Sequence, residues 1–266
     1  NEAQMAVNGV YAGLTNQNMY RNRNYRGAIQ FGTDIICPQR KVVQTPYNYL
    51  MTEGLGDMNA AWREMYLIIR NANSAIANIN KAETLSADEK NQLIGELYVL
   101  RALIYYDLTR FWGDVPFFTD ELSTEELSVL PRTPMETIRT QMKSDLSQAK
   151  TLLPSSYTGG DIGRMTKWAA AALKAKFHLF DKEWSETLAE SLDIINNSPH
   201  KLMDNFADVI AYDKTTLDNE VNDEHILWVD FAGATGIETN MLGDGTQSNL
   251  WIEEFNPRLK DNPKNK

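Results

Sequence analysis

Residues that build disulfides and metal centres are scarce in this sequence. Its 266 residues include a single cysteine, Cys37, so no disulfide can form within the chain. The three histidines are scattered, and none stands at zinc-ligand spacing from another. A zinc site therefore has little support in the sequence, and no metal site is predicted.

Positive charge and long apolar segments are scarce as well. The chain has 26 lysines and arginines against 36 aspartates and glutamates, which gives a formal net charge of −10. A nucleic-acid partner requires a basic face, so this charge balance argues against one. No apolar run approaches the roughly 18 residues of a membrane-spanning helix.

Familiar catalytic motifs are also missing. The sequence contains no nucleophile elbow, no phosphate-binding glycine loop and no H-E-x-x-H metalloprotease motif. An acidic segment at 218–224 is rich in oxygen ligands but lacks the EF-hand pattern of glycine and glutamate, so a solvated loop is the favoured interpretation. These motifs therefore identify no catalytic residue.

A helical pattern dominates what is present, and its clearest segment is 86–118. Ser86 and Glu89 have the spacing of a capping box, whereas Gly113 and Pro116 mark the end of the helix. A second face carries three tyrosines and an alanine, so we expect this helix to be covered on more than one side. The apolar residues of the first face recur every three or four positions: Leu93, Leu97, Leu100, Ile104, Leu108 and Phe111.

Other segments share this periodicity. For the helix after residue 133, we expect Thr133 as the N-cap, Pro134 as the first helical residue and Glu136 as the partner in a capping box. Helix pairs at 59–112 and 134–181 predict a mainly α fold of tetratricopeptide-like stacked helix hairpins, with long loops and a few short strands. No strict 34-residue period supports consensus tetratricopeptide repeats. The remaining expected elements are helices at 3–15 and 184–197 and a strand at 222–231. Within the pair at 134–181, Gly163-Arg164 is expected to open the second helix.

Some helical residues carry expectations about burial. Arg101 lies inside the apolar helix, and a buried charge requires a partner. A carboxylate on the neighbouring helix, such as Glu64, is the expected partner. Four tryptophans stand at helix-period or capping positions and are expected in the core: Trp62, Trp112, Trp168 and Trp184.

The central helix also carries a family resemblance. Its motifs, Leu100-Arg101-Ala102, Tyr105 to Leu108 and Phe111 to Pro116, resemble the signature of the SusD/RagB family of surface glycan-binding lipoproteins of Bacteroidetes. In that family these residues hold the helical scaffold together. The resemblance extends over nearly the whole chain and implies a single SusD-like domain at 1–266. Relatives continue into a loop-rich C-terminal half, which we expect to be absent or truncated here. Further matches to the family pattern are Ile68 to Asn73, Arg132, Asp145-Leu146, Leu153-Pro154 and Gly163-Arg164.

The resemblance implies a function at the cell surface. It predicts a glycan-binding component of an outer-membrane nutrient uptake system, working with a TonB-dependent SusC-like transporter. The ligand would be an oligosaccharide or polysaccharide, although family membership leaves glycopeptide or peptide cargo open. Binding would need no cofactor and would change no bond, so the resemblance implies a protein that is not an enzyme. The protein would be a surface-exposed lipoprotein of the outer membrane, attached only through a lipid anchor upstream of residue 1.

Candidate ligand-binding residues lie in two segments without helical pattern. Sugars stack on aromatic rings, while amides and charged groups bond their hydroxyls. The family binds glycans with loop aromatics from two such regions, and ordinary loop packing is the alternative for each residue. The candidates are Asp34, Arg40, Tyr47 and Tyr49 in the first segment and Asn249 and Trp251 in the second.

Two other functions remain open from the residues alone. The first is a helical-repeat scaffold that binds a protein partner, for which an aromatic-poor concave face would be the sign. The second is an all-helical glycoside hydrolase, which would need two facing carboxylates. With 36 acidic residues, the sequence neither identifies such a pair nor excludes one.

Overall fold

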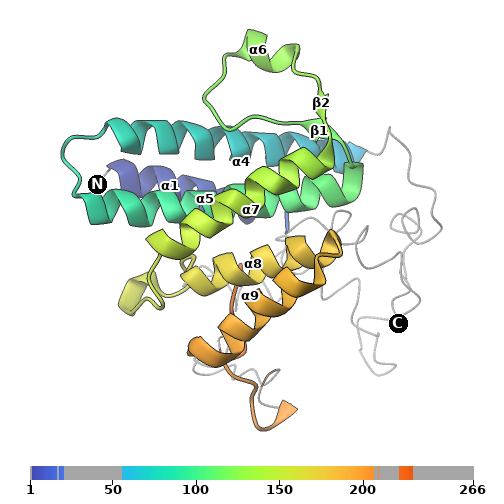
Figure 1. Ribbon diagram of the computed structural model, residues 1–266. Helices are drawn as coiled ribbons and strands as arrows, with labels where there is room; N and C mark the ends of the chain where they lie inside the picture. Colours follow the sequence, from blue (N-terminus) through green and yellow to red (C-terminus); the bar gives the residue numbers. More distant parts are fainter. Residues whose placement is uncertain (1, 17, 21–55, 207–208, 210–221, 230–266) are drawn as a thin grey trace, which may run out of the picture. The chain divides into compact units, whose positions relative to one another are not determined.

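The computed structural model describes residues 2–16, 18–20, 56–206, 209 and 222–229 (Figure 1). The chain divides into two compact units. The first comprises Asn1–Tyr11 and Ile68–Val229, and the second comprises Ala12–Leu67 and Asp230–Lys266. Most of the described residues belong to the first unit, which is treated by itself below.

Helices make up most of the described structure, so the predicted mainly α fold is confirmed. One small antiparallel sheet accompanies them, in which Val115 pairs with Thr133 and Pro116 with Arg132. In chain order the elements are α1 (Glu2–Leu14), α4 (Gly56–Lys81), α5 (Ala87–Trp112), β1 (Val115–Pro116), α6 (Thr124–Ser128), β2 (Arg132–Thr133), α7 (Met135–Leu152), the 3-10 turn η2 (Gly159–Asp161), α8 (Lys167–Phe180) and α9 (Trp184–Asn197).

Within the first unit the helices stack in sequence order. α5 packs against α7, α7 against α8, and α8 against α9 (Figure 1). The end of α4 runs antiparallel to α5, because Asn73 contacts Arg101 while Asn80 contacts Lys90, near the other end of α5. Neighbouring helices therefore stack as the predicted helix hairpins do.

Helix α5 is enclosed by its neighbours within this stack, among them α7, α8 and β1. Both of its faces are covered, since Leu100 and Ile104 of the apolar stripe and Tyr105 of the second face are all fully buried. Gly95 lets α5 approach the end of α7 closely, because a Cβ there would lie 2.8 Å from Leu153 Cγ. The prediction that this helix is covered on more than one side is confirmed.

Both predicted ends of α5 are also confirmed. The Ser86 Oγ accepts a hydrogen bond from the Glu89 amide at 3.2 Å, and the Glu89 carboxylate accepts one from the Ser86 amide at 2.9 Å. Gly113 has a φ of +68°, and its amide donates to the Thr109 carbonyl at 3.2 Å. Glycine adopts this positive φ without the steric cost that a Cβ would impose.

The predicted capping box of α7 is wrong. Thr133 belongs to β2, where it pairs with Val115, and Pro134 takes the N-cap position without any side-chain hydrogen bond. Asp114, next to β1, supplies the side-chain acceptor at the start of α7. Its Oδ1 accepts a hydrogen bond from the Met135 amide at 3.0 Å. The strand pair thus brings a distant carboxylate to the helix start, where an anion is favourable.

Three further expectations need correction. Residues 222–229 form turns rather than a strand, with the His225 amide donating to the Asn222 carbonyl at 3.0 Å. α8 begins at Lys167 rather than at residue 163, because Thr166 caps it. Trp168 is buried as predicted, whereas Trp184 is 62% exposed and does not belong to the core.

Arg101 finds its partner on α7, not on α4 as predicted with Glu64. Its Nη2 and Nε bind Asp145 Oδ2 at 2.5 and 3.2 Å, and both side chains are almost completely buried. Its Nη1 donates to Asn73 Oδ1 at 2.7 Å and to the Thr119 carbonyl at 3.2 Å. One guanidinium therefore joins α4, α5, α7 and the chain that follows β1.

The same network fixes the chain after β1. The Asn73 amide nitrogen donates to the carbonyls of Phe118 and Asp120 at 3.2 and 3.3 Å. Tyr105 exchanges two hydrogen bonds with the Phe118 backbone, donating to its carbonyl at 3.0 Å and accepting from its amide at 3.1 Å. These buried partners give the signature residues the scaffold role that the resemblance implies.

We expect Leu100→Ala or Ile104→Ala to lower the free energy of unfolding by about 2–5 kcal/mol, because each leaves a cavity in a fully buried site. Denaturation in urea measures this. Val129→Ala is the control: this side chain is 79% exposed, so the change should stay within about 0.5 kcal/mol. Equal effects at all three positions would mean that α5 is not the core.

We expect Asp145→Ala to cost about 3–5 kcal/mol, because it leaves the buried Arg101 charge without its carboxylate. Adding Arg101→Met should cost less than the sum of the two single changes, as a double-mutant cycle by chemical denaturation would show. The matched control is Lys201→Ala, which breaks a solvent-exposed pair with Asp223 and should cost at most about 1 kcal/mol. Additive losses would contradict a direct coupling.

Candidate functional site

The six predicted ligand-binding residues lie outside the described residues. Four belong to 21–55 and two belong to 230–266. Their role in binding stays a prediction. The described residues do include α1, which precedes the first segment in the sequence. α1 takes part in a buried polar cluster.

We call this cluster the Glu96 junction. It consists of Asn8 and Tyr11 on α1, Glu96 on α5, and Tyr157 and Arg164 in the connection between α7 and α8. The periodic pattern places Glu96 on the central helix but gives no sign of its partners. They stand 61 to 85 positions away in the sequence, so only the folded chain brings them together.

Glu96 is the centre of the junction and is fully buried. Its Oε2 accepts hydrogen bonds from the Tyr11 hydroxyl at 2.7 Å and from Arg164 Nη1 at 2.9 Å. Its Oε1 accepts a longer one from the Tyr157 hydroxyl at 3.5 Å. A buried carboxylate is tolerated in this way only when it is paired and hydrogen-bonded.

Arg164 extends the junction to the protein surface. Its Nε binds Asp161 Oδ1 at 2.7 Å, and its Nη2 donates to Asn8 Oδ1 at 2.8 Å. The Tyr11 hydroxyl, which donates to Glu96, also accepts from the Met165 amide at 2.8 Å. α1 is therefore bound both to α5 and to the loop that precedes α8.

Burial controls the protonation of these groups. Burial raises the pKa of the Glu96 carboxyl, and the Tyr11 hydrogen bond and the Arg164 charge act in the opposite direction. Burial, followed by the nearby Glu96 charge, raises the pKa of both the Tyr11 and the Tyr157 phenols, which therefore stay protonated donors at physiological pH. Because Arg164 binds both Glu96 and Asp161, we interpret the junction as a means of holding elements together rather than as an acid–base pair.

A second contact adds residues 222–229 to the same region. Gly163 has a φ of +99°, and a Cβ there would lie 3.6 Å from the Trp228 ring. The rings of His225 and Trp228 meet edge to face with centroids 6.2 Å apart. In sequence, α1 leads into the first candidate segment and 222–229 lead directly into the second. The residues that precede each candidate segment in the sequence, α1 and 222–229, therefore contact the region around Gly163 and Arg164.

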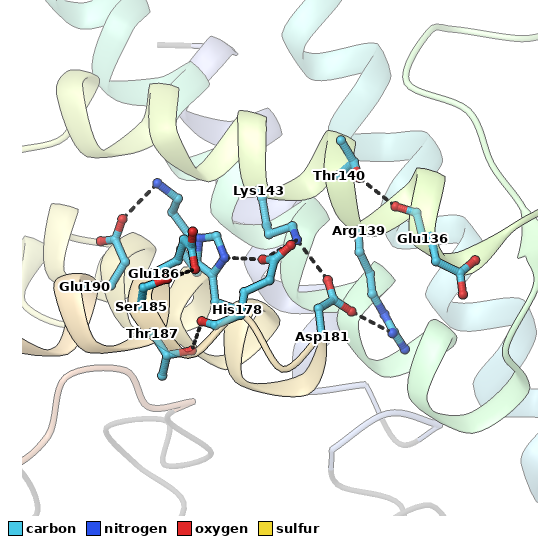
Figure 2. Close-up of polar contacts among 12 residues, drawn as sticks. Glu136, Arg139, Thr140, Lys143, His178, Asp181, Ser185, Glu186, Thr187 and Glu190 are labelled. Carbon is cyan, nitrogen blue, oxygen red and sulfur yellow. Dashed lines mark hydrogen bonds and ion pairs between the residues drawn. The ribbon is translucent and has the colours of Figure 1, made fainter.

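The other charged cluster joins α7, α8 and α9. Figure 2 shows Lys143 of α7 reaching Asp181, which also binds Arg139. Lys143 Nζ binds Glu183 as well, at 2.7 Å, and the Glu183 carboxylate contacts His178 Nδ1. These pairs tie the turn between α8 and α9 to α7. No group of metal-ligating residues occurs in the described part of the chain, and none of its helices is long and apolar enough to cross a membrane.

Comparison with known proteins gives SusD-like relatives. A SusD-like protein of Formosa agariphila is 35% identical over an alignment of 285 positions, which covers 99% of this chain and 53% of that protein. A SusD-like protein of Bacteroides ovatus is 29% identical over 189 residues, covering 65% of this chain and 33% of the relative. The chain thus spans about half the length of the first relative and a third of the second.

Solved structures show the same fold. A laminarin-binding SusD-like protein matches with a TM-score of 0.74 at 23% identity, over 85% of this chain and 50% of that one. A SusD superfamily protein from Bacteroides vulgatus matches with a TM-score of 0.75 at 21% identity, over 87% of this chain and 49% of that one. A family model, SusD-like and described as starch-binding associating with outer membrane, matches residues 3–179. The chain therefore belongs to the SusD-like family.

Proposed function

We propose that this protein binds glycans at the outer surface of a bacterium and passes them to an outer-membrane transporter. The observation that carries this proposal is the family match over residues 3–179, whose model is described as starch-binding and associated with the outer membrane. The transporter would be of the TonB-dependent, SusC-like kind. The protein would be a lipoprotein held to the membrane by an anchor upstream of residue 1. It would use no cofactor and break no bond.

The proposed ligand contacts are the six residues of the two candidate segments. Tyr47, Tyr49 and Trp251 would stack on sugar rings, because the flat apolar face of a pyranose packs well on an aromatic ring. Asp34, Arg40 and Asn249 would bond the hydroxyls of the sugar.

The Glu96 junction supports this proposal through its position in the sequence. It binds the second half of α1 through Asn8 and Tyr11, and α1 precedes the first candidate segment. Beside it, Trp228 packs on Gly163, just before the second candidate segment. Binding groups on loops need a rigid base to keep their geometry. We infer that the junction and Trp228 fix the chain that leads into each segment.

The choice of test ligand follows from the relatives. One structural relative is described as laminarin-binding, and the family model is described as starch-binding. Oligosaccharides of laminarin and of starch are therefore the first two glycans to titrate, with cellulose oligosaccharides as a third, differently linked glucan.

We expect Trp251→Ala to weaken binding of the better of these glycans about ten- to thirty-fold. Aromatic stacking contributes roughly 0.5–1.5 kcal/mol beyond the buried area, hot-spot aromatics lose about 2 kcal/mol on truncation, and 1.4 kcal/mol corresponds to tenfold. Isothermal titration calorimetry measures the affinity, and a thermal melt checks the fold. Trp184→Ala is the matched control, because Trp184 is 62% exposed on a helix of the stack and is not a proposed ligand contact.

The same experiment separates the alternatives. Unchanged affinity in Trp251→Ala would remove this residue from the site, and a collapsed melt would make it a core residue. Release of reducing sugar by the pure protein would replace the binding function by glycoside hydrolysis. Failure to bind any glycan would contradict the proposed function as a whole.

A further inference from the structure

Residues 222–229 bring two aromatic rings together, directly before the second candidate segment in the sequence. The rings of His225 and Trp228 meet edge to face, at an interplanar angle of 74° and with centroids 6.2 Å apart. Both residues are partly exposed. We call this pair the His225–Trp228 corner. It belongs to the same compact unit as Gly163 and Glu96, so its place beside them is defined.

The turn around His225 fixes which nitrogen of its ring carries the proton. The Asn222 amide donates to His225 Nδ1 at 3.0 Å, and the His225 amide donates to the Asn222 carbonyl at 3.0 Å. A ring nitrogen that accepts a hydrogen bond carries no proton, so the neutral imidazole has its hydrogen on Nε2. Within the part of the chain that the structure describes, this Nε2–H meets no acceptor. His225 therefore presents one open hydrogen-bond donor.

Trp228 presents a second open donor, at its indole nitrogen. A Cβ at position 163 would lie 3.8 Å from Trp228 Nε1, so the glycine there leaves the space beside this nitrogen unfilled. No residue in the described ranges accepts a hydrogen bond from it. Trp168 shows the usual arrangement of a buried tryptophan, because its Nε1 donates to Ser155 Oγ at 2.8 Å. Trp228 differs in both respects, and a partly exposed ring with an unpaired N–H is suited to receive a ligand.

The chemistry of the corner matches that of a sugar. The apolar C–H face of a pyranose packs on an aromatic ring, and its hydroxyl oxygens accept hydrogen bonds from N–H groups. Here one ring carries a donor at its edge, and a nearly perpendicular ring adds a second donor. One sugar unit can therefore gain both a stacking contact and two hydrogen bonds.

The charges beside the corner favour an uncharged sugar over an acidic one. Asp223 and Glu224 lie in the same turn, and the Glu224 carboxylate accepts from the Met203 amide at 2.7 Å. Lys201 Nζ lies 3.4 Å from Asp223 Oδ2, so one ammonium offsets one of the two carboxylates. The remaining negative charge disfavours a ligand that carries carboxylate or sulfate groups.

We propose that the His225–Trp228 corner is a further contact for the glycan and selects uncharged sugar units. The indole stacks on the sugar, while Trp228 Nε1 and His225 Nε2 donate hydrogen bonds to its hydroxyls. This inference rests on the proposed function and adds two ligand contacts and a class of ligand to it.

Indole N–H signals in a 1H–15N NMR spectrum test this contact directly. The sequence has six tryptophans, and Trp228→Phe identifies the Trp228 signal by its loss. We expect this signal to shift when the best-bound of the laminarin, starch and cellulose oligosaccharides is added, because the N–H gains an acceptor. The Trp168 signal is the internal control and should stay in place, since its N–H is already bound to Ser155. An oligogalacturonide, as the acidic probe, should move neither signal.

Two conservative variants measure the contribution of each donor. Trp228→Phe keeps an aromatic ring but removes the N–H, and His225→Asn keeps an acceptor for the Asn222 amide but removes the Nε2 donor. Each should weaken binding of the neutral glycan about three- to tenfold in calorimetry, which is the effect of one hydrogen bond. A cooperative thermal melt shows that each variant is folded. Trp184→Phe, at an exposed position of α9, is the matched control and should bind as the unchanged protein does.

The outcomes separate this inference from the proposed function. If the unchanged protein binds glycan while the Trp228 signal stays in place and both variants keep full affinity, the corner is not a contact and the proposed function stands. A shift with the oligogalacturonide but with none of the neutral glucans would overturn the selection of uncharged sugars. Absence of binding to any glycan would overturn the proposed function and this inference with it.

Discussion

The buried pairing of Arg101 with Asp145 is the interaction on which the helical scaffold depends. A guanidinium inside an apolar helix requires a carboxylate and further acceptors, and the fold supplies them from three other segments. A one-turn shift of α7 along α5 would leave both charges buried and unpaired. Dispersion and burial stabilise many arrangements of apolar helices, whereas this pair is satisfied in one register. Asn73, which binds both Arg101 and the chain after β1, extends the constraint to α4.

Signals between residues close in the sequence were sufficient for much of the fold. The ends of α5 follow from Ser86, Glu89 and Gly113, whose contacts span three or four residues. The N-terminus of α7 did not follow from such a signal, because the β1–β2 pairing engages Thr133 and brings Asp114 to the helix from 21 residues away. Periodicity located the apolar face of α9 but not the side on which it lies. The polar face of α9 is the one that packs on α7 and α8, because Glu190 binds Lys150 and Lys174 there.

The candidate site was predictable to a smaller degree. Glu96 and Arg164 stand 68 residues apart in the sequence. The helical period around each residue gives no indication that the two form a pair. Only the resemblance singled out Gly163 and Arg164, and it did so without naming their partners. The six proposed ligand contacts rest on the resemblance and on the chemistry of their side chains. These six residues stand in segments without a helical period, so physical reasoning from the sequence gives their chemistry but not their geometry.

The central claim is that residues of 21–55 and 230–266 bind the glycan while the stacked helices support them, and hydrogen–deuterium exchange tests it directly. The protein is compared with and without a saturating glycan of the laminarin or starch type. If the stacked helices form a rigid base, the amides of α5 and α7 should exchange slowly in both states and should not respond to the glycan. Protection should increase in 21–55 and 230–266. Protection that instead develops along α5, α7 or α8, with none in those two segments, would contradict the account.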